Sequence, residues 1–344
     1  MTFLPTRWFR VRLAGALCLG SCFLVTACNR HAGPQEAAYV SAVQANLRDR
    51  VAAAYEKAGV VKNGDKVDVL DHDRRFVKVR TASGAVGWIE QRYLVAQDVF
   101  DQLQQLTRDN LNDPVQGQAT TRNDTNLHVE PGRDSEHLYQ ISTGEKVSLL
   151  KRATAEKPGA VAAPPRGAKA SENKQPVPVL EDWWLVRDSH DRVGWVLGRM
   201  VDLDVPLEIA QYAEGQRIVA FFVLNQVQDD DKMVPQYLTV VTEPKDGLPF
   251  DFNQIRVFTW NVKRHRYETA YRERLEGALP VTLSRENFDK EGTLPVFVIR
   301  VRDESGTIRE QKYKLNTPIV RRVLAPGEEP VRTSKRASSR RRRR

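Results

Sequence analysis

The residue types that most often perform chemistry are sparse in this chain of 344 residues. Its three cysteines are Cys18, Cys22 and Cys28, so the sequence after Cys28 offers no thiolate for a cysteine-nucleophile enzyme. The six histidines lack the clustered spacing of a zinc centre, and no glycine loop is built to cradle a phosphate. We therefore expect no metal, no cofactor and no enzyme activity. The hypothesis of a glycosidase that uses two carboxylates is not excluded, because the sequence does not show which acidic residues lie close together across strands.

The one cysteine with a chemical signal around it is Cys28. Arg7, Arg10 and Arg12 form a basic segment before the apolar run 13–27. That run is shorter than the ~20 apolar residues that a transmembrane helix needs. A basic start, an apolar stretch and small residues at its end are the layout of a secretory signal, which predicts a signal peptide over residues 1–27.

The residues Leu24-Val25-Thr26-Ala27-Cys28 resemble the lipobox of bacterial lipoproteins. The resemblance implies cleavage before Cys28 and acylation of both its thiol and its new amine, which together suffice for a stable membrane anchor. Asn29 replaces the Asp that tends to retain such lipoproteins in the inner membrane. We therefore expect an outer-membrane lipoprotein facing the periplasm. The alternative is an ordinary signal peptide with an incidental cysteine.

Positive charge is concentrated at the far end of the chain. The formal net charge is +9, and the segment 321–344 holds ten Lys and Arg against two Glu. The body between the signal and this segment is therefore close to neutral. Residues 324–344 have few apolar side chains to pack, which predicts a disordered tail. This tail is either passively solvated or attracted to anionic envelope polymers, through its last five residues Arg340, Arg341, Arg342, Arg343 and Arg344.

The body contains an internal repeat. Residues 46–70 match residues 126–150 at a constant offset of 80, with Asn-Leu and Gly-x-Lys-Val at equivalent positions. Residues 76–89 match residues 183–196 at an offset of 107, with an aromatic residue, Val-Arg and Gly-Trp at equivalent positions. The second copy therefore carries 27 extra residues. Its segment 153–179 is rich in Ala, Pro, Lys and Gly, which predicts a disordered surface insertion.

Each copy has the period-two patterning of short strands, and each places a glycine directly before a tryptophan, at Gly87 and Gly194. A glycine there permits a bulge or a close backbone approach. The first copy, with Asn-x-Arg, Gly-x-x-Val-x-Val-Leu, an aromatic with Val-x-Val-Arg and Gly-Trp-Ile, resembles the bacterial Src-homology-3 family. The second keeps this frame but has His128 in place of the arginine. The resemblance implies two small bent barrels, over residues 39–95 and 120–202, that bind peptidoglycan peptides or other envelope ligands.

Four aromatic residues are the candidate ligand-binding side chains. Trp88 and Trp195 are predicted to fill the barrel seams, because so small a barrel needs large side chains to close. Phe76 and Trp183 lie opposite buried strand positions, so alternation makes them the better candidates for an exposed groove. Alternatively, that face packs on a neighbouring domain.

The rest of the chain is predicted to be mainly β. A helical linker over 96–119 has Val99, Leu103 and Leu106 on one face, and a short helix is predicted over 207–214. Residues 203–323 are predicted to form an antiparallel β domain. Part of it resembles one blade of a β-propeller, but one blade cannot close a propeller, so we expect a small sheet or sandwich. Its candidate strands are 218–224, 236–242, 254–260, 266–272, 295–302 and 307–315.

These patterns predict a non-catalytic, membrane-anchored envelope lipoprotein that binds peptidoglycan or another cell-wall ligand. The alternative is a scaffold or assembly lipoprotein whose barrels bind an envelope protein. Nucleic acid is not an expected partner, because no stacking aromatics interleave with the arginines of the tail.

Replacing Cys28 with Ser should leave the protein without lipid, because the hydroxyl does not replace the acylated thiol. We expect the variant to move from the detergent phase to the soluble envelope fraction in a phase-partition assay. Fatty-acid labelling that persists in the Cys28→Ser protein would contradict the lipoprotein interpretation.

Overall fold

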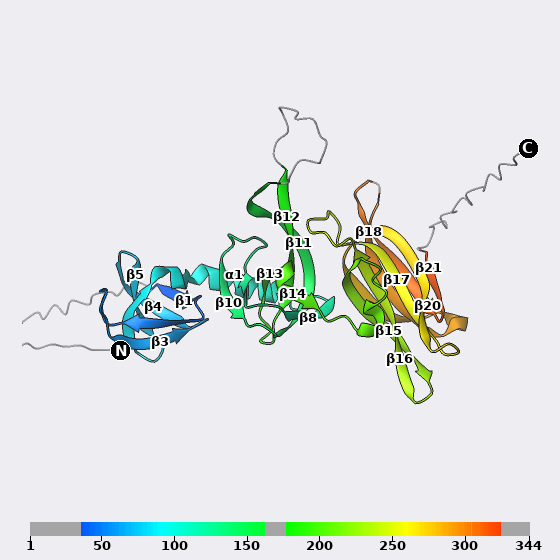
Figure 1. Cartoon of the computed structure of the whole chain (residues 1–344), viewed down its shortest axis with the longest axis horizontal. Coiled ribbons are helices and arrows are strands. Elements are labelled where there is room, and N and C mark those ends of the chain that lie inside the picture. Colours follow the sequence, from blue (N-terminus) through cyan, green and yellow to red (C-terminus); the bar gives the residue numbers. More distant parts are fainter. Residues whose placement is uncertain (1–35, 162–176, 304, 325–344) are drawn as a thin grey trace, which may run out of the picture. The chain divides into compact units, whose positions relative to one another are not determined.

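The computed structural model describes residues 36–161, 177–303 and 305–324. Cys28, the arginines at 340–344 and most of the predicted insertion therefore lie outside the described residues. Within them the chain is mainly β and forms three seven-stranded antiparallel sheets (Figure 1). The predicted fold class, mainly β with antiparallel sheets, is confirmed, but the two predicted barrels are open sheets in the described residues. No helix in the described part of the chain is long and apolar enough to cross a membrane.

The first sheet, residues 37–96, is called module 1. Its strands hydrogen bond in the order β3-β2-β6-β5-β4-β1-β7. Apolar positions alternate along them, so Leu47, Val61, Val67, Val79 and Ile89 meet in one core. The strands are β1 (Ala37–Val40), β2 (Gln44–Arg48), β3 (Lys57–Lys62), β4 (Lys66–Asp73), β5 (Phe76–Thr81), β6 (Val86–Glu90) and β7 (Leu94–Ala96), with a 3₁₀ turn η1 (Gln91–Tyr93) before the last.

The second sheet, residues 117–203, is called module 2 and repeats the first strand for strand. Its order is β10-β9-β13-β12-β11-β8-β14, which is the order of module 1 with each strand number raised by seven. The 80 and 107 residue offsets seen in the sequence thus connect equivalent strands. The strands are β8 (Gly117–Thr121), β9 (Thr125–His128), β10 (His137–Ile141), β11 (Lys146–Val161), β12 (Pro178–Arg187), β13 (Val193–Leu197) and β14 (Val201–Leu203), with η2 (Gly198–Met200) before the last.

Each module is a bent open sheet. Because β3 and β7 are the two edges of module 1, and β10 and β14 those of module 2, hydrogen bonding closes neither described sheet into a barrel. Register shifts between Val69 and Asp71 and between Leu149 and Lys151 mark bulges at equivalent places. Such bulges strengthen the local twist, which lets a small sheet bend around its own core.

The predicted insertion begins later than its composition indicated. Strand β11 continues through residues 153–161 and pairs with β12 at Thr154–Asp182, Ala155–Glu181 and Glu156–Leu180. Disorder was therefore the wrong prediction for 153–161 and 178–179. The physical reason is that the two stems satisfy each other's backbone hydrogen bonds, which composition alone does not reveal. Residues 162–176 lie outside the described part.

Helix α1 (Gln97–Asp109) follows module 1 and contacts both modules. The face predicted from the sequence is the buried one, with Val99 and Leu103 almost fully covered. Phe100 stacks on Tyr39 of module 1 with ring centroids 4.3 Å apart. Leu106 packs against the Leu185 and Trp195 cluster of module 2. The predicted linker is thus a packing element, although its last residues, 117–119, belong to β8.

One side chain also joins the two modules through hydrogen bonds. The Asn63 amide donates to the carbonyls of Ser41 (2.8 Å) and Leu138 (2.7 Å), and its oxygen accepts from the Gln140 N–H (3.1 Å). Ser41 belongs to module 1, whereas Leu138 and Gln140 belong to β10. The side chain of Asn63 therefore makes, with the backbone of both modules, hydrogen bonds that link the two sheets.

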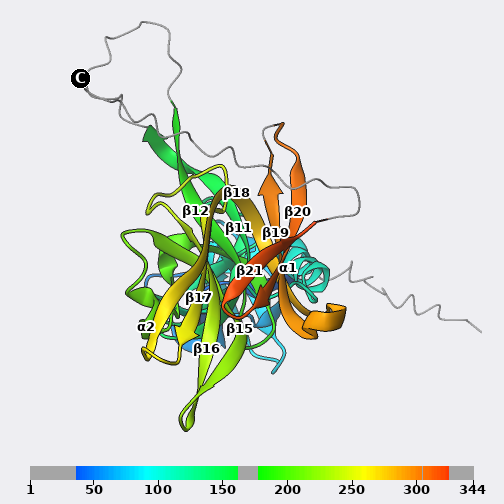
Figure 2. The same ribbon diagram turned by 90° about the vertical axis from the view of Figure 1, so that its right-hand side faces the viewer.

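The third sheet is a simple meander in which each strand pairs with the next (Figure 2). The six predicted strands are all present, and β18 extends well beyond its predicted end. Helix α2 (Leu207–Ala210) is shorter than the predicted 207–214, because the N–H groups of Tyr212 and Ala213 donate to carbonyls three residues back and Glu214 has a φ of 53°. The strands are β15 (Arg217–Asp229), β16 (Lys232–Thr242), β17 (Phe252–Asn261), β18 (Arg266–Asn287), β19 (Thr293–Arg302), β20 (Ile308–Asn316) and β21 (Ile319–Val323), with η3 (Asp289–Glu291) after β18.

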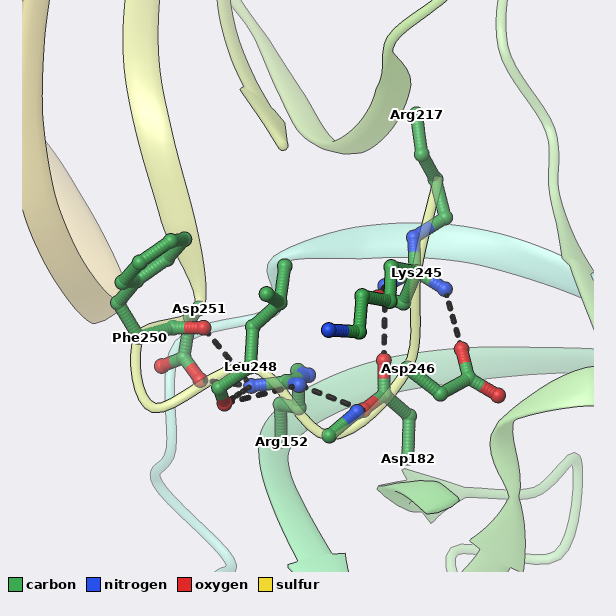
Figure 3. A network of polar contacts seen from close by, with 9 residues as sticks. Arg152, Asp182, Arg217, Lys245, Asp246, Leu248, Phe250 and Asp251 are labelled. Atoms are coloured by element: carbon green, nitrogen blue, oxygen red, sulfur yellow. Dashed lines mark hydrogen bonds and ion pairs between the residues drawn. The ribbon is translucent and has the colours of Figure 1, made fainter. Parts of the chain in front are cut away.

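A buried ionic network joins module 2 to the third sheet (Figure 3). Arg152 and Asp182 come from the extended β11–β12 hairpin, and each side chain is only 4% exposed. They pair at 2.5 Å, and Arg152 also reaches Asp251 at 3.0 Å. The second Asp182 oxygen accepts from Arg217 at 2.8 Å. The Gly247 N–H donates to Asp182 as well, so the carboxylate is fully satisfied.

Burial by itself raises the pKa of Asp182, but the hydrogen bonds from Arg152 and Gly247 and the two arginine charges outweigh it. The pKa of Asp182 in the folded protein is therefore lowered. A carboxyl group with a lowered pKa stabilises the fold above its unfolded value of about 4. That contribution is lost as the pH falls through the folded value.

Asp182→Asn should destabilise the protein by about 3–5 kcal/mol near pH 7, because it leaves buried Arg152 without its closest counter-charge. Urea denaturation measures this change, and the loss should shrink as the pH is lowered below 4. Asp202→Asn is the matched control, since the Arg122–Asp202 pair of module 2 is more than half exposed and should contribute under about 1 kcal/mol. Equal effects of the two substitutions would contradict the assignment.

Candidate functional site

The four predicted aromatic residues do not form one exposed groove. Phe76 and Trp183 are 5% and 2% exposed, so the prediction that they line an open groove is wrong. Alternation did place them opposite Val77 and Trp184, but both faces of these strands are covered. The Arg48 guanidinium lies 4.9 Å above the Phe76 ring, and the His128 ring meets Trp183 edge-on at 5.2 Å.

The two seam tryptophans are half-buried. Trp195 and Leu106 of helix α1 pack against the same buried cluster of Leu150, Leu185 and Val193. Trp88 has the Lys78 ammonium 5.8 Å from its ring centroid. They lie in different modules, and no site in the described residues brings the four aromatic side chains together.

The surface with the features of a binding site lies beside Phe76. Two hollows, of about 220 and 540 Å³, share the side chain of Glu90. We call them together the Glu90 groove. Strand β2, the end of β6 and the turn η1 that follows it supply most of its wall. Its chemically distinctive residues are Asn46, Arg48, Tyr55, Arg75, Glu90, Arg92 and Tyr93.

Arg48 is held in place from three sides. Its guanidinium lies over the Tyr55 ring at 4.3 Å and over the Phe76 ring at 4.9 Å. Its Nη2 atom pairs with Glu90 Oε1 at 3.3 Å. Cation–π contact and charge pairing fix the plane of the guanidinium before any ligand arrives. Such a fixed fork is suited to bidentate contact with a carboxylate or phosphate.

The groove has more positive than negative side chains. Glu90 is paired with Arg48 and, at 2.9 Å, with Arg92, whose side chain is 69% exposed. Arg92 also donates to the Tyr93 hydroxyl at 2.8 Å. Arg75 lies at the other hollow, over the Phe76 ring. Three arginines face one carboxylate, so the groove favours ligands that carry negative charge.

Module 2 lacks the same groove although its strands match. The position 80 residues after Arg48 is His128, whose Nδ1 contacts the Ser135 carbonyl at 3.0 Å. Burial lowers the pKa of His128, so its ring is neutral near pH 7. The position 107 residues after Glu90 is Leu197, which removes the central carboxylate. The second copy therefore keeps the frame and loses the ionic chemistry.

The sequence pointed to the strands of the groove but missed most of its residues. Arg48 belongs to the Asn-x-Arg pattern used above. Glu90 directly follows Gly-Trp-Ile, and Leu197 follows the equivalent Gly-Trp-Val, so a comparison of the two copies at this position could have found it. Tyr55 lies in the loop between β2 and β3, where no periodic pattern marks it.

A comparison with known families finds one match, within module 1. Residues 43–95 match the family model described as bacterial SH3 domain. Module 1 contains a bacterial SH3 domain. All seven distinctive residues of the Glu90 groove lie inside the matched range. Among curated proteins no match is found.

Solved structures give weak likenesses to the chain that contains this SH3 domain. A protein of the NlpC/P60 family from Bacillus cereus is 13% identical with a TM-score of 0.23, and covers 56% of this chain. The match spans 65% of that protein's own length. NlpC2 and NlpC1 from Trichomonas vaginalis are each 10% identical with TM-scores of 0.17, over 80% of this chain and 92% and 87% of theirs.

The SH3 domain positions Arg48 by a close approach between two strands. A Cβ atom added at Gly87 of β6 would lie 2.8 Å from the Leu47 Cβ and 3.0 Å from the Arg48 carbonyl. The expectation that this glycine permits a close approach is confirmed. Gly194 has the same role in module 2, where an added Cβ would lie 2.7 Å from the Leu127 Cβ.

Gly87→Ala should push β2 away from β6, which destabilises the protein by about 1–3 kcal/mol through overpacking. We expect the substitution also to displace Arg48 from Glu90 and to lower the affinity of the groove for any ligand. Gly194→Ala is the matched control, with a similar loss in a chemical denaturation experiment and an intact groove. Unchanged stability of both variants would show that the strands have room for a methyl group.

Proposed function

We propose that this protein is a non-catalytic cell-envelope protein that binds cell-wall material through the Glu90 groove, while a lipid on Cys28 holds it at the membrane. The observation that carries the proposal is the groove itself, because it lies within the matched SH3 domain and is lined by fixed, charged side chains. The bacterial SH3 match supports a role associated with the cell wall.

The groove is built for binding rather than for catalysis. Its titratable side chains are arginines, tyrosines and one glutamate, and Glu90 is committed to two ion pairs. A general base needs an accessible lone pair near the substrate, and a nucleophile needs an adjacent activating group. Arg48 and Arg92 instead present N–H donors, which recognise anions without changing them.

Charge and shape favour a ligand with carboxylates on a short backbone. Peptidoglycan stem peptides carry several carboxylates, and the two hollows on either side of Glu90 offer separate contacts for such groups. Tyr55 is 39% exposed and gives the groove an aromatic edge on which an aliphatic portion can pack. A folded envelope protein is the other candidate partner, and the binding experiment below distinguishes the two.

Module 2, which we propose is a second, diverged SH3-like domain, does not share this role. Arg199 stands 107 residues after Arg92 and is exposed on the equivalent turn, but Leu197 stands in place of Glu90 and Met200 in place of Tyr93. The chain thus contains its own control for the contribution of a groove arginine.

Arg92→Ala should weaken binding to purified peptidoglycan sacculi roughly ten-fold, since losing a charged contact costs about 1.4 kcal/mol. Tyr55→Ala should have a comparable effect, and Arg199→Ala should have none. Co-sedimentation with sacculi measures the binding, and thermal unfolding checks that all three variants stay folded.

The outcomes separate the candidate partners. If wild-type protein does not sediment with sacculi but is retained by an envelope protein in an Arg92-dependent manner, the scaffold alternative replaces the cell-wall proposal. If Arg92→Ala and Arg199→Ala weaken binding equally, attraction by general positive charge explains the binding and the groove does not. Raising the salt concentration then tests the same point, because exposed charge attraction is screened over ~8 Å at physiological ionic strength.

A further inference from the structure

Two hairpin turns of the third sheet bring potential metal ligands together. Strand β15 ends at Asp229 and β16 begins at Lys232, whereas β17 ends at Asn261 and β18 begins at Arg266. In an antiparallel meander, alternate turns lie at the same end of the sheet. One ligand atom each from Asp229, Asp230 and His265 therefore fall within 4.8 Å of one another.

Asp229 is the anchor of this cluster. Its side chain is 9% exposed, and its Oδ2 atom accepts from Trp260 Nε1 at 2.7 Å and pairs with His265 Nδ1 at 2.8 Å. Its other oxygen, Oδ1, is buried without any hydrogen-bond partner. A simple ion pair with His265 accounts for Oδ2 and leaves Oδ1 unexplained.

An unsatisfied buried carboxylate oxygen is costly, at about 1–3 kcal/mol or more for a charged group. A bound cation removes that cost because it supplies positive charge to both oxygens. We propose that Asp229, Asp230 and His265 bind a divalent transition-metal ion of the zinc type.

The donor set selects the class of ion. One imidazole nitrogen with two carboxylates suits zinc, whereas calcium and magnesium prefer all-oxygen sites. Three protein ligands leave a fourth position for water, and Asp230 and His265 are exposed. Tetrahedral zinc needs donors about 3.3 Å apart, given bond lengths near 2.0 Å. The two exposed side chains can close that distance, while the Trp260 N–H holds Asp229 as an outer-shell partner.

Module 2 contains a comparable pair without these features. His190 Nδ1 lies 3.9 Å from Asp188 Oδ2. Both oxygens of Asp188 are already used, since Oδ1 accepts from the N–H groups of His190 and Arg192 and Oδ2 accepts from Arg192 Nε at 2.7 Å. The Asp229 carboxylate therefore has an oxygen without a hydrogen-bond partner, whereas the Asp188 carboxylate has none.

Titration calorimetry of the tag-free protein with zinc chloride tests the site. We expect one saturable zinc ion per chain and a higher thermal unfolding temperature with zinc. His265→Ala and Asp230→Asn should each weaken the affinity at least ten-fold and abolish the thermal shift. His190→Ala should leave both readouts unchanged.

Asp230 is exposed, so its substitution does not threaten folding and keeps the test decisive. Absence of saturable zinc binding by the wild-type protein overturns the proposal. An equal loss in His190→Ala also overturns it, because it shows that zinc binds surface histidines in general. Neither result bears on the Glu90 groove, which contains none of these residues.

Discussion

Asp182 is the residue on which the joining of module 2 to the third sheet depends. Its carboxylate is removed from water, and burial of a charge is strongly unfavourable unless partners replace the lost hydration. Arg152, Arg217 and the Gly247 N–H provide that replacement from three directions. Because Arg217 and Gly247 belong to the third sheet and its β16–β17 loop, the Asp182 carboxylate makes all of these contacts only when module 2 and the third sheet are packed together. The ionic network therefore specifies how they meet, in addition to any stability it contributes.

The extension of the β11–β12 hairpin is what makes this contact possible. In module 1 the equivalent strands end at Asp73 and Phe76, joined by a short turn. In module 2 they continue past the same point, and the stem residue Leu180 lies against Gly247, where an added Cβ would be 2.6 Å from the Leu180 Cβ. A segment whose composition resembles a flexible insert thus contributes its first and last residues to a packed interface.

Much of the fold could be predicted from spacing, and the site could not. Constant offsets of 80 and 107 residues identified equivalent strands, because a repeated strand order requires a repeated sequence frame. Alternation placed Phe76 and Trp183 correctly relative to their neighbours, but it gives no information on what covers each face. Arg48 and His128 contact these two rings, and they come from the equivalent strands β2 and β9, which lie two places away in the sheet order. The groove combines side chains of β2, β6, η1 and the β2–β3 loop, and the Asp229 cluster combines those of two hairpin turns, so no single local pattern contains either of them.

The two modules differ in which equivalent surface is exposed and which is buried. The position of Arg75, at the open groove of module 1, is occupied by Asp182 in module 2, where it is buried against the third sheet. Phe76 lies under a partly exposed arginine, whereas Trp183 meets a half-buried histidine edge-on. At Asp182 this end of module 2 packs against the third sheet, whereas Arg199 on the equivalent turn is exposed. Leu197 and His128 stand where module 1 has Glu90 and Arg48, so among the described residues the ion pair of the proposed groove belongs to module 1.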